Sequence, residues 1–203
     1  LEYENFNAAA ATVEVKGRSV HPGTAKDAMI NSIMVAGHLD SLLPQRERPE
    51  FTEGYEGFFH LYDIRGSVEE TLMKYIIRDH DPVKFSERKK HLNEAVAETG
   101  KRFPGAAGRV VMKDQYFNMK EIIEANYHII EAAVKAYRMA GVEPVIKPVR
   151  GGTDGARLSF MGLPCPNLFT GGHNYHGRFE YIPLQSMEKA VEVIINLCIS
   201  VNK

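Results

Sequence analysis

The residues best suited to chemistry lie in one segment, Arg150 to Pro183, which reads RGGTDGARLSFMGLPCPNLFTGGHNYHGRFEYIP. It contains a Gly-Gly-Thr-Asp turn, a Gly-Gly-His-Asn turn, and His176 four residues before Glu180. Glycine doublets let the backbone come close to a ligand. The polar side chains beside them are of the kinds that bind metals, carboxylates and oxyanions. We interpret this segment as part of an active site.

His176 is the candidate metal ligand, because a neutral imidazole is a good ligand for zinc. One histidine cannot hold a metal ion, and the sequence shows no cluster of His, Asp and Glu with the spacing to complete a set of ligands. If His176 binds zinc, its partner ligands lie outside this chain. His173, three residues earlier, is an equal rival on sequence alone, and an exposed loop histidine is the plainer interpretation of either.

Two further side chains of the segment could bind a substrate. Arg150 precedes a glycine doublet, and a guanidinium beside a flexible turn suits bidentate binding of a carboxylate. A surface ion pair explains the arginine equally well. Asn174 could donate its amide to a substrate carbonyl or terminus, or it could simply hold its turn.

A second candidate site comes before an expected helix, in the loop His-Pro-Gly-Thr-Ala-Lys that begins at His21. The start of a helix offers unpaired N–H groups and a field that favours anions. His21 could therefore polarise a carbonyl oxygen or contact a carboxylate, although a loop histidine beside a proline turn is the plainer alternative. The same two interpretations apply to Arg78, near the end of an expected strand: it could contact a ligand, or it could have no role in binding.

The elements that must position these residues follow from hydrophobic periodicity and turn signals. In the first part of the chain we predict strands at 8–16, 58–65, 70–79 and 109–116, and helices at 27–43 and 82–99. The order strand, helix, strand, strand, helix, strand is the split βαβ, ferredoxin-like arrangement, in which two helices cover an antiparallel sheet.

From Asn118 onward the pattern changes to long helices separated by short apolar runs. We predict helices at 121–140, with a break near Asn126, at 153–161 and at 184–201, and short strands at 144–149 and 167–170. Helices that alternate with short apolar strands indicate an α/β layer. So few strands make a poor sheet alone, which predicts that part of this layer is missing.

The bulk composition is that of an ordinary globular protein, with 203 residues, 44% hydrophobic and 25% charged residues, and a net charge of -1. This balance predicts no nucleic-acid partner, and no apolar run approaches the roughly 20 residues that span a bilayer. Two cysteines fit a reducing compartment, so we expect a cytoplasmic protein. The chain begins at Leu1, as if inside a strand, and we expect it to be a piece of a longer polypeptide.

Several stretches carry a family resemblance: YENFNAA, VHPGTAKDAMINSI, FTEGYEG, YIIRDHD and the segment that begins at Arg150. Together they resemble the co-catalytic zinc peptidase family that includes carboxypeptidase G and acetylornithine deacetylase. The resemblance implies an α/β catalytic domain with two zinc ions, interrupted by a smaller α+β, ferredoxin-like lid. Residues 1–6 would be an edge of the catalytic domain, 7–117 the lid, and 118–203 the C-terminal part of the catalytic domain.

The resemblance also assigns roles to individual residues. It implies that His176, and not His173, is the metal ligand, and that His21 reaches a substrate carbonyl in the partner subunit's site. It implies that three residues bind substrate, the two arginines at a peptide's C-terminal carboxylate: Arg78, Arg150 and Asn174. The partners implied are a short peptide and a second copy, which dimerises through the lid's second helix or edge strand.

The activity implied is a zinc-dependent aminopeptidase that releases the N-terminal residue from tripeptides. In the family, a His-x-Asp motif, a bridging aspartate, a Glu-Glu pair with the general base and another ligand aspartate precede the matching segment. None of them is present in this chain, so we expect the segment alone to be inactive and to bind zinc weakly. The alternatives are a non-catalytic module for dimerisation or peptide binding, and an amidohydrolase or deacetylase of acylated amino acids.

Overall fold

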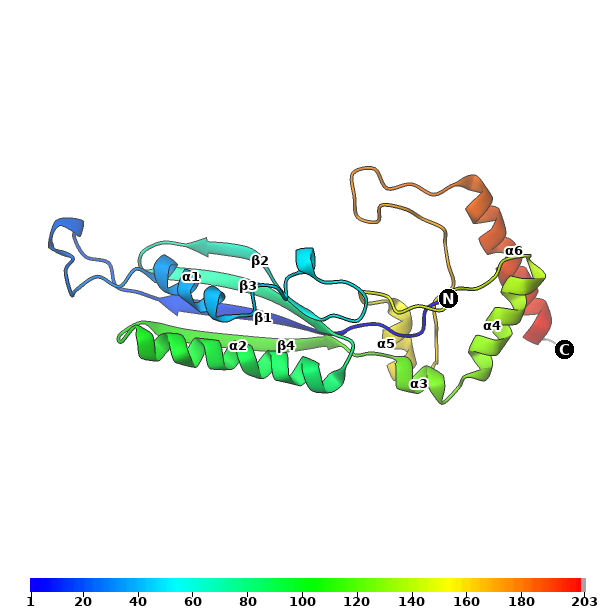
Figure 1. Ribbon diagram of the computed structural model, residues 1–203, viewed down its shortest axis with the longest axis horizontal. Coiled ribbons are helices and arrows are strands. Elements are labelled where there is room, and N and C mark those ends of the chain that lie inside the picture. The colour runs from blue at the N-terminus through cyan, green and yellow to red at the C-terminus, as the bar shows by residue number, and fades with distance from the viewer. Residues whose placement is uncertain (202–203) are drawn as a thin grey trace. The chain divides into compact units, whose positions relative to one another are not determined.

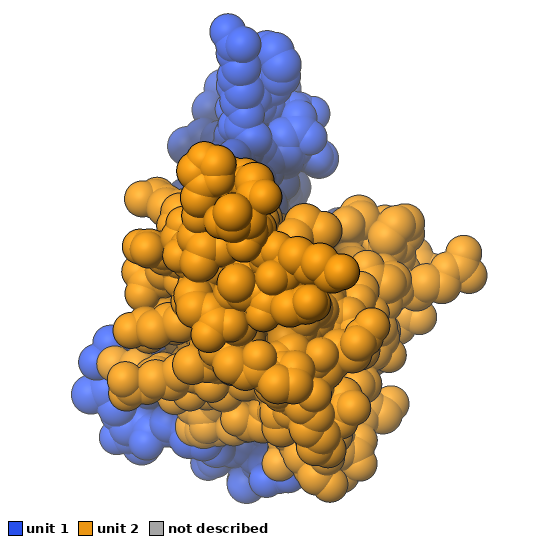
Figure 2. Space-filling view, turned by 90° about the vertical axis from the view of Figure 1, so that its left-hand side faces the viewer, with its two compact units in different colours: residues 1–5, 118–203 blue, residues 6–117 orange. Residues whose placement is uncertain are grey.

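The computed structural model describes residues 1–201, which divide into two compact units (Figure 1). One unit is the continuous stretch Phe6–Phe117. The other combines Leu1–Asn5 with the chain from Asn118 onward, and Figure 2 colours the two units separately. The chain therefore leaves the second unit after five residues and returns to it only after the first unit is complete.

The Phe6–Phe117 unit is a four-stranded sheet with two helices. Its sheet has the order β2-β3-β1-β4, and every neighbouring pair is antiparallel. The predicted ferredoxin-like arrangement is confirmed. The elements are β1 Asn7–Lys16, α1 Ser32–Leu42, β2 Phe58–Gly66, β3 Glu70–Asp79, α2 Pro82–Arg102 and β4 Ala107–Tyr116, with short 3-10 turns η1 Pro22–Thr24 and η2 Pro49–Phe51.

The core of this unit follows from the alternation of side chains along the two central strands. Successive residues of a strand point to opposite faces of the sheet, so every second residue can be buried. Leu39 of α1 and Leu92 of α2 are fully buried in the same core as these residues. The core residues of β1 and β3 are paired across the sheet: Ala9 with Ile77, Ala11 with Tyr75, and Val13 with Met73.

Two helix boundaries differ from the prediction. The first helix begins at Ser32 and not at Asp27, because Asp27 has a φ of 57°, which is left-handed and not helical. Asn31 caps the helix instead, since its side chain accepts the N–H of Ile33 at 3.0 Å. The second helix continues through Gly100 to Arg102, because one glycine costs a helix only about 1 kcal/mol.

The second unit contains α3 Lys120–Glu124, α4 His128–Met139, α5 Asp154–Phe160 and α6 Leu184–Val201. The predicted break near Asn126 is confirmed, since it separates α3 from α4. Thr153 caps α5 by accepting the N–H of Ala156 at 3.2 Å. Val193 of α6 shares a buried core with residues of α4. No helix in the described part of the chain is long and apolar enough to cross a membrane.

The predicted strands at 144–149 and 167–170 are wrong. Val149 forms a single parallel bridge with Asn5, and Asn167 forms a single antiparallel bridge with Glu2. Both segments thus pair with the short N-terminal stretch Leu1–Asn5, and only at isolated positions. A strand requires consecutive pairing with a neighbour, which apolar sequence alone does not supply.

Candidate functional site

His21 lies in the loop that joins β1 to α1, directly before the short turn η1. The loop begins at Gly17, where a Cβ atom would lie 2.2 Å from the carbonyl oxygen of Ile30, so only glycine fits. Arg18 and Ile30 then exchange two backbone hydrogen bonds, of 2.8 Å and 3.0 Å, which close the base of the loop. Figure 1 shows the loop, with η1, projecting beyond the sheet of this unit, and His21 is exposed there.

The imidazole of His21 is held by its own turn. The N–H of Gly23 donates to Nδ1 of His21 at 3.1 Å. Thr24 donates to the carbonyl oxygen of His21 through its N–H at 3.0 Å and its hydroxyl at 3.3 Å. The turn therefore fixes both the backbone and the ring of an exposed histidine.

Arg78 lies on the face of the sheet opposite the helices, because its neighbour Ile77 points into the core. Its Nη1 donates to the carbonyl oxygens of Ala9 and Ile77 at 3.1 Å and 2.9 Å, and its Nη2 donates to Oε1 of Gln115 at 3.0 Å. The guanidinium also lies 5.3 Å from the centre of the Tyr116 ring. Burial lowers the pKa of Arg78, and Tyr116 opposes that shift. Arg78 is thus bound to its own sheet.

The register of the sheet places His21 and Arg78 at opposite ends of the unit. Lys16, where β1 ends before the His21 loop, is paired with Glu70, while Ala8 is paired with Arg78. The eight-residue separation of Lys16 and Ala8 corresponds to about 27 Å along the strand. A fully extended tripeptide spans only about 10 Å. One copy of this unit therefore cannot bring both side chains to one tripeptide.

Arg150 follows the bridge that ties its segment to the N-terminal stretch. The N–H of Val149 donates to the carbonyl oxygen of Glu4 at 2.8 Å, and the chain bends directly afterwards. The helix that follows packs closely on the backbone, because a Cβ at Gly155 would lie 2.2 Å from the carbonyl oxygen of Cys165. The half-buried Arg150 thus lies between the hydrogen bond of Val149 to Glu4 and the closely packed start of α5.

His173 and His176 have different settings, although the sequence leaves them equal. His173 exchanges two backbone hydrogen bonds with Tyr181, at 2.8 Å and 3.2 Å, which close the turn between them. The two rings are stacked, with their centres 5.0 Å apart. Both histidines are exposed, but the ring of His173 is stacked on Tyr181, whereas His176 lies inside the closed turn.

The turn holds Asn174 and His176 in left-handed conformations, with φ of 56° and 60°. Such values are uncommon outside glycine, and in other residues they often mark functional sites. The N–H of His176 donates to Oε2 of Glu180 at 3.0 Å, and the side-chain amide of Asn174 donates to the carbonyl oxygen of Phe179 at 3.1 Å. In this structure the Asn174 amide thus holds the turn, one of the two roles that the sequence allows.

The described residues do not complete a zinc site. No group of three or more His, Cys, Asp or Glu side chains that could hold a metal ion occurs in the described part of the chain. Because zinc requires three or four protein ligands, His176 by itself does not fit a bound ion.

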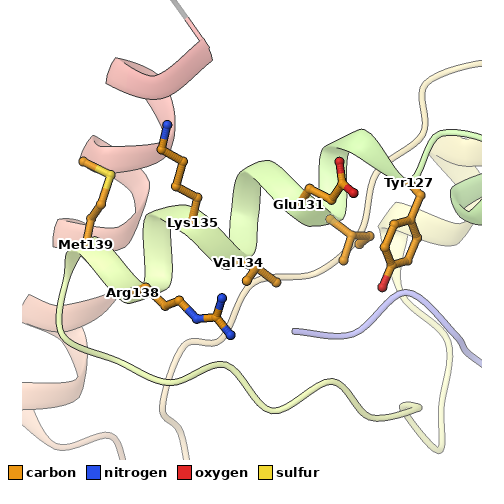
Figure 3. A pocket seen from close by; sticks show the side chains of 7 residues that line it. Tyr127, Glu131, Val134, Lys135, Arg138 and Met139 are labelled. Atoms are coloured by element: carbon orange, nitrogen blue, oxygen red, sulfur yellow. The ribbon is translucent and has the colours of Figure 1, made fainter.

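A pocket of about 650 Å³ lies on α4 and does not coincide with these residues (Figure 3). Apolar side chains such as Val134 line it beside Tyr127 and charged groups such as Arg138. None of the five candidate residues lines this pocket: His21, Arg78, Arg150, Asn174 and His176.

Sequence reasoning missed several of the residues that hold the candidate side chains. Gly23 binds the ring of His21, and Gln115 and Tyr116 hold the guanidinium of Arg78. The spacing of a glycine two residues after a histidine is the available signal for Gly23. Gln115 and Tyr116 carry no such signal, because the register of β4 against the other strands is not readable from one sequence.

Comparison with known proteins decides the family. The model of the M20 peptidase dimerisation domain matches residues 3–104, half of the chain. The chain belongs to the M20 peptidase family. The family expected from the sequence is thus confirmed, as is the α/β fold with its ferredoxin-like unit.

Similar M20 proteins are about twice as long as this chain. A Peptidase T of Clostridium perfringens is 60% identical, and one of Caldanaerobacter subterraneus is 56% identical, each over 197 residues. Each match covers 97% of this chain and 48% of the relative, so the chain spans about half the length of these curated relatives. The crystal structure of aminopeptidase PepT from Bacillus cereus has a TM-score of 0.83 at 20% identity, covering 100% of this chain and 54% of that chain. That likeness concerns the fold.

Proposed function

We propose that this M20 chain is part of a zinc-dependent aminopeptidase that releases the N-terminal residue from tripeptides in the cytoplasm. The observation that carries the proposal is the 56–60% identity to proteins named Peptidase T over 97% of the chain. In this account the unit Phe6–Phe117 is a lid that dimerises. The other unit is the C-terminal part of the catalytic domain.

The zinc site of this proposal is shared with a part of the protein that this chain does not span. His176 supplies one ligand, and the relatives' other half supplies the remaining ligands and the general base. When bound, zinc polarises a substrate carbonyl and activates a water molecule. Because one ligand cannot replace a full set, the chain alone is proposed to be inactive and to bind zinc weakly.

The apolar surface of α6 supports the existence of such a further part. Leu184, Val191 and Ile195 are 64%, 55% and 52% exposed along this helix. Single exposed apolar residues are ordinary, but a row of them on one helix marks a surface that another element covers. The half of the relatives that is absent from this chain is the proposed cover.

The distance between His21 and Arg78 supports a dimer in which two copies share each site. Since one lid cannot bring both side chains to one tripeptide, they must come from different copies if both contact the substrate. His21 of one copy would bind the substrate carbonyl in its partner's site. Arg78, Arg150 and Asn174 would bind the rest of the peptide, with the arginines at its C-terminal carboxylate.

The test is a chimera in which the N-terminal half of the Clostridium perfringens relative precedes this chain. This relative is chosen because it is 60% identical to this chain over the 197 residues that they share. We expect the chimera, loaded with zinc, to hydrolyse a free tripeptide and to release its N-terminal residue. Hydrolysis of an N-acetylated amino acid in place of the tripeptide would favour the deacetylase. A folded dimeric chimera without either activity would favour the dimerisation module.

Replacing Arg150 by alanine in the chimera should weaken the binding of free tripeptides selectively. Loss of a charge-assisted hydrogen bond to the terminal carboxylate should raise KM by about 10- to 100-fold. A tripeptide amide has no terminal carboxylate for Arg150 to bind. We expect KM to rise by this factor for the free tripeptide and to stay unchanged for its amide. The matched control is Arg157→Ala, an exposed arginine of α5, which should change neither. Equal effects of Arg150→Ala on both substrates would contradict the carboxylate clamp.

A further inference from the structure

We infer that Gly23 is a positioning residue, which holds the imidazole of His21 with its proton on Nε2 so that this nitrogen is a hydrogen-bond donor. The inference rests on the proposed function, in which His21 binds a substrate carbonyl. It adds the residue that sets the orientation and the tautomer of the ring. The inference is based on two features of Gly23: its backbone N–H and its lack of a side chain.

The N–H of Gly23 selects the tautomer. It donates to Nδ1 of His21 at 3.1 Å, a normal distance for such a bond. A neutral imidazole has one protonated nitrogen and one that accepts, so an Nδ1 that accepts leaves the proton on Nε2. Nε2 is the nitrogen farther from the backbone and therefore the one that can reach a ligand. A carbonyl oxygen needs a donor, which the other tautomer would not present there.

The missing side chain of Gly23 leaves room for the ring. A Cβ atom at this position would lie 3.1 Å from Nδ1 and 3.1 Å from Cε1 of His21. Unbonded carbon atoms prefer about 3.5 to 4.0 Å, so the ring would have to move away by several tenths of an ångström. That movement lengthens and weakens the bond from the Gly23 amide to Nδ1.

The backbone of the turn cannot easily move to relieve this contact. Thr24 donates two hydrogen bonds to the carbonyl oxygen of His21, and Nε of Arg18 donates to the carbonyl oxygen of Ala28 at 2.6 Å farther down the loop. Pro22 fixes its own φ between His21 and Gly23. The ring is therefore the part that gives way when a side chain is added at Gly23.

The hydrogen bond itself is tested by NMR on the 203-residue chain labelled with nitrogen-15. We expect a scalar coupling between the amide nitrogen of Gly23 and Nδ1 of His21, together with imidazole shifts of the Nε2–H tautomer. Both should be lost in Gly23→Ala. The matched control is Gly100→Ala, where a Cβ meets no atom within 4 Å, and this variant should keep both signals. Amide spectra that match elsewhere show that each variant is folded.

The consequence for catalysis is tested in the chimera. We expect Gly23→Ala to lower kcat for a free tripeptide by about threefold to tenfold, the range of one hydrogen bond, with KM little changed. Gly100→Ala should leave kcat unchanged. Absence of the coupling in the unaltered chain overturns the inference and leaves the proposed function standing. If the coupling is present but the chimera does not hydrolyse tripeptides, only the proposed function is contradicted. If the coupling is present and the Gly23→Ala and Gly100→Ala chimeras have equal kcat, the positioning role is overturned.

Discussion

Substitution of His21 by alanine in the chimera is expected to lower kcat for a free tripeptide by about 100- to 1,000-fold. This is the loss found when one donor to a developing oxyanion is removed from an enzyme. The donor binds the carbonyl oxygen more strongly as negative charge develops on it, so the effect should fall on kcat and leave KM nearly unchanged. Steady-state kinetics on one tripeptide measures both constants.

The matched control for His21 is His91→Ala, which removes an exposed imidazole from α2 of the same unit. We expect this variant to keep the unaltered kcat. Mixed dimers give a second check, because His21 is proposed to act in its partner's site. A chimera with His21→Ala and a chimera with His176→Ala should regain activity when they are mixed and allowed to exchange subunits. A His21→Ala variant with the unaltered kcat would remove His21 from the site.

Substitution of His176 by alanine is expected to lower the zinc affinity of the chimera by more than about 100-fold and to abolish hydrolysis. Loss of a residue that only supports a ligand already costs about 10- to 100-fold, and loss of the ligand itself should cost more. Zinc content after dialysis against a buffered zinc concentration measures the affinity directly. Hydrolysis is recorded on the same samples.

His173→Ala is the matched control, since it removes an imidazole three residues away in the same turn. The ring of His173 is stacked on Tyr181, so its loss should loosen the turn without removing a ligand. We expect the His173→Ala chimera to keep most of its zinc. If His173→Ala loses the metal and His176→Ala retains it, the assignment of the two histidines is reversed.

The ferredoxin-like unit could be predicted from the sequence because its signals are local and agree with one another. Alternation along β1 and β3, the proline at the start of α2, and the β2–β3 turn each indicate the same order of elements. The start of α1 could not be predicted, because Met29 and Ile30 continue the apolar pattern of the helix and yet belong to the loop. What holds that loop is the backbone pairing of Arg18 with Ile30, which no side-chain pattern reveals.

The candidate site was only partly predictable for a related reason. Residue types and glycines single out the Arg150 segment and the His21 loop, since such chemistry is visible in one stretch of sequence. Some of the contacts that orient these side chains join residues far apart in the chain, as Gln115 does with Arg78, and one sequence does not reveal them. The expected strands at 144–149 and 167–170 failed likewise, because apolar residues do not say whether a continuous neighbouring strand exists.

The most direct test of the account is the rate of free-tripeptide hydrolysis by the 203-residue chain beside the rate of the chimera. Both are measured at equal concentration in the same zinc buffer, after circular dichroism has shown that both are folded. We predict hydrolysis by the chimera and no rate above the buffer for the chain alone, because His176 is one ligand of a site whose remaining ligands lie in the other half. Hydrolysis by the chain alone at a rate near that of the chimera would contradict the account.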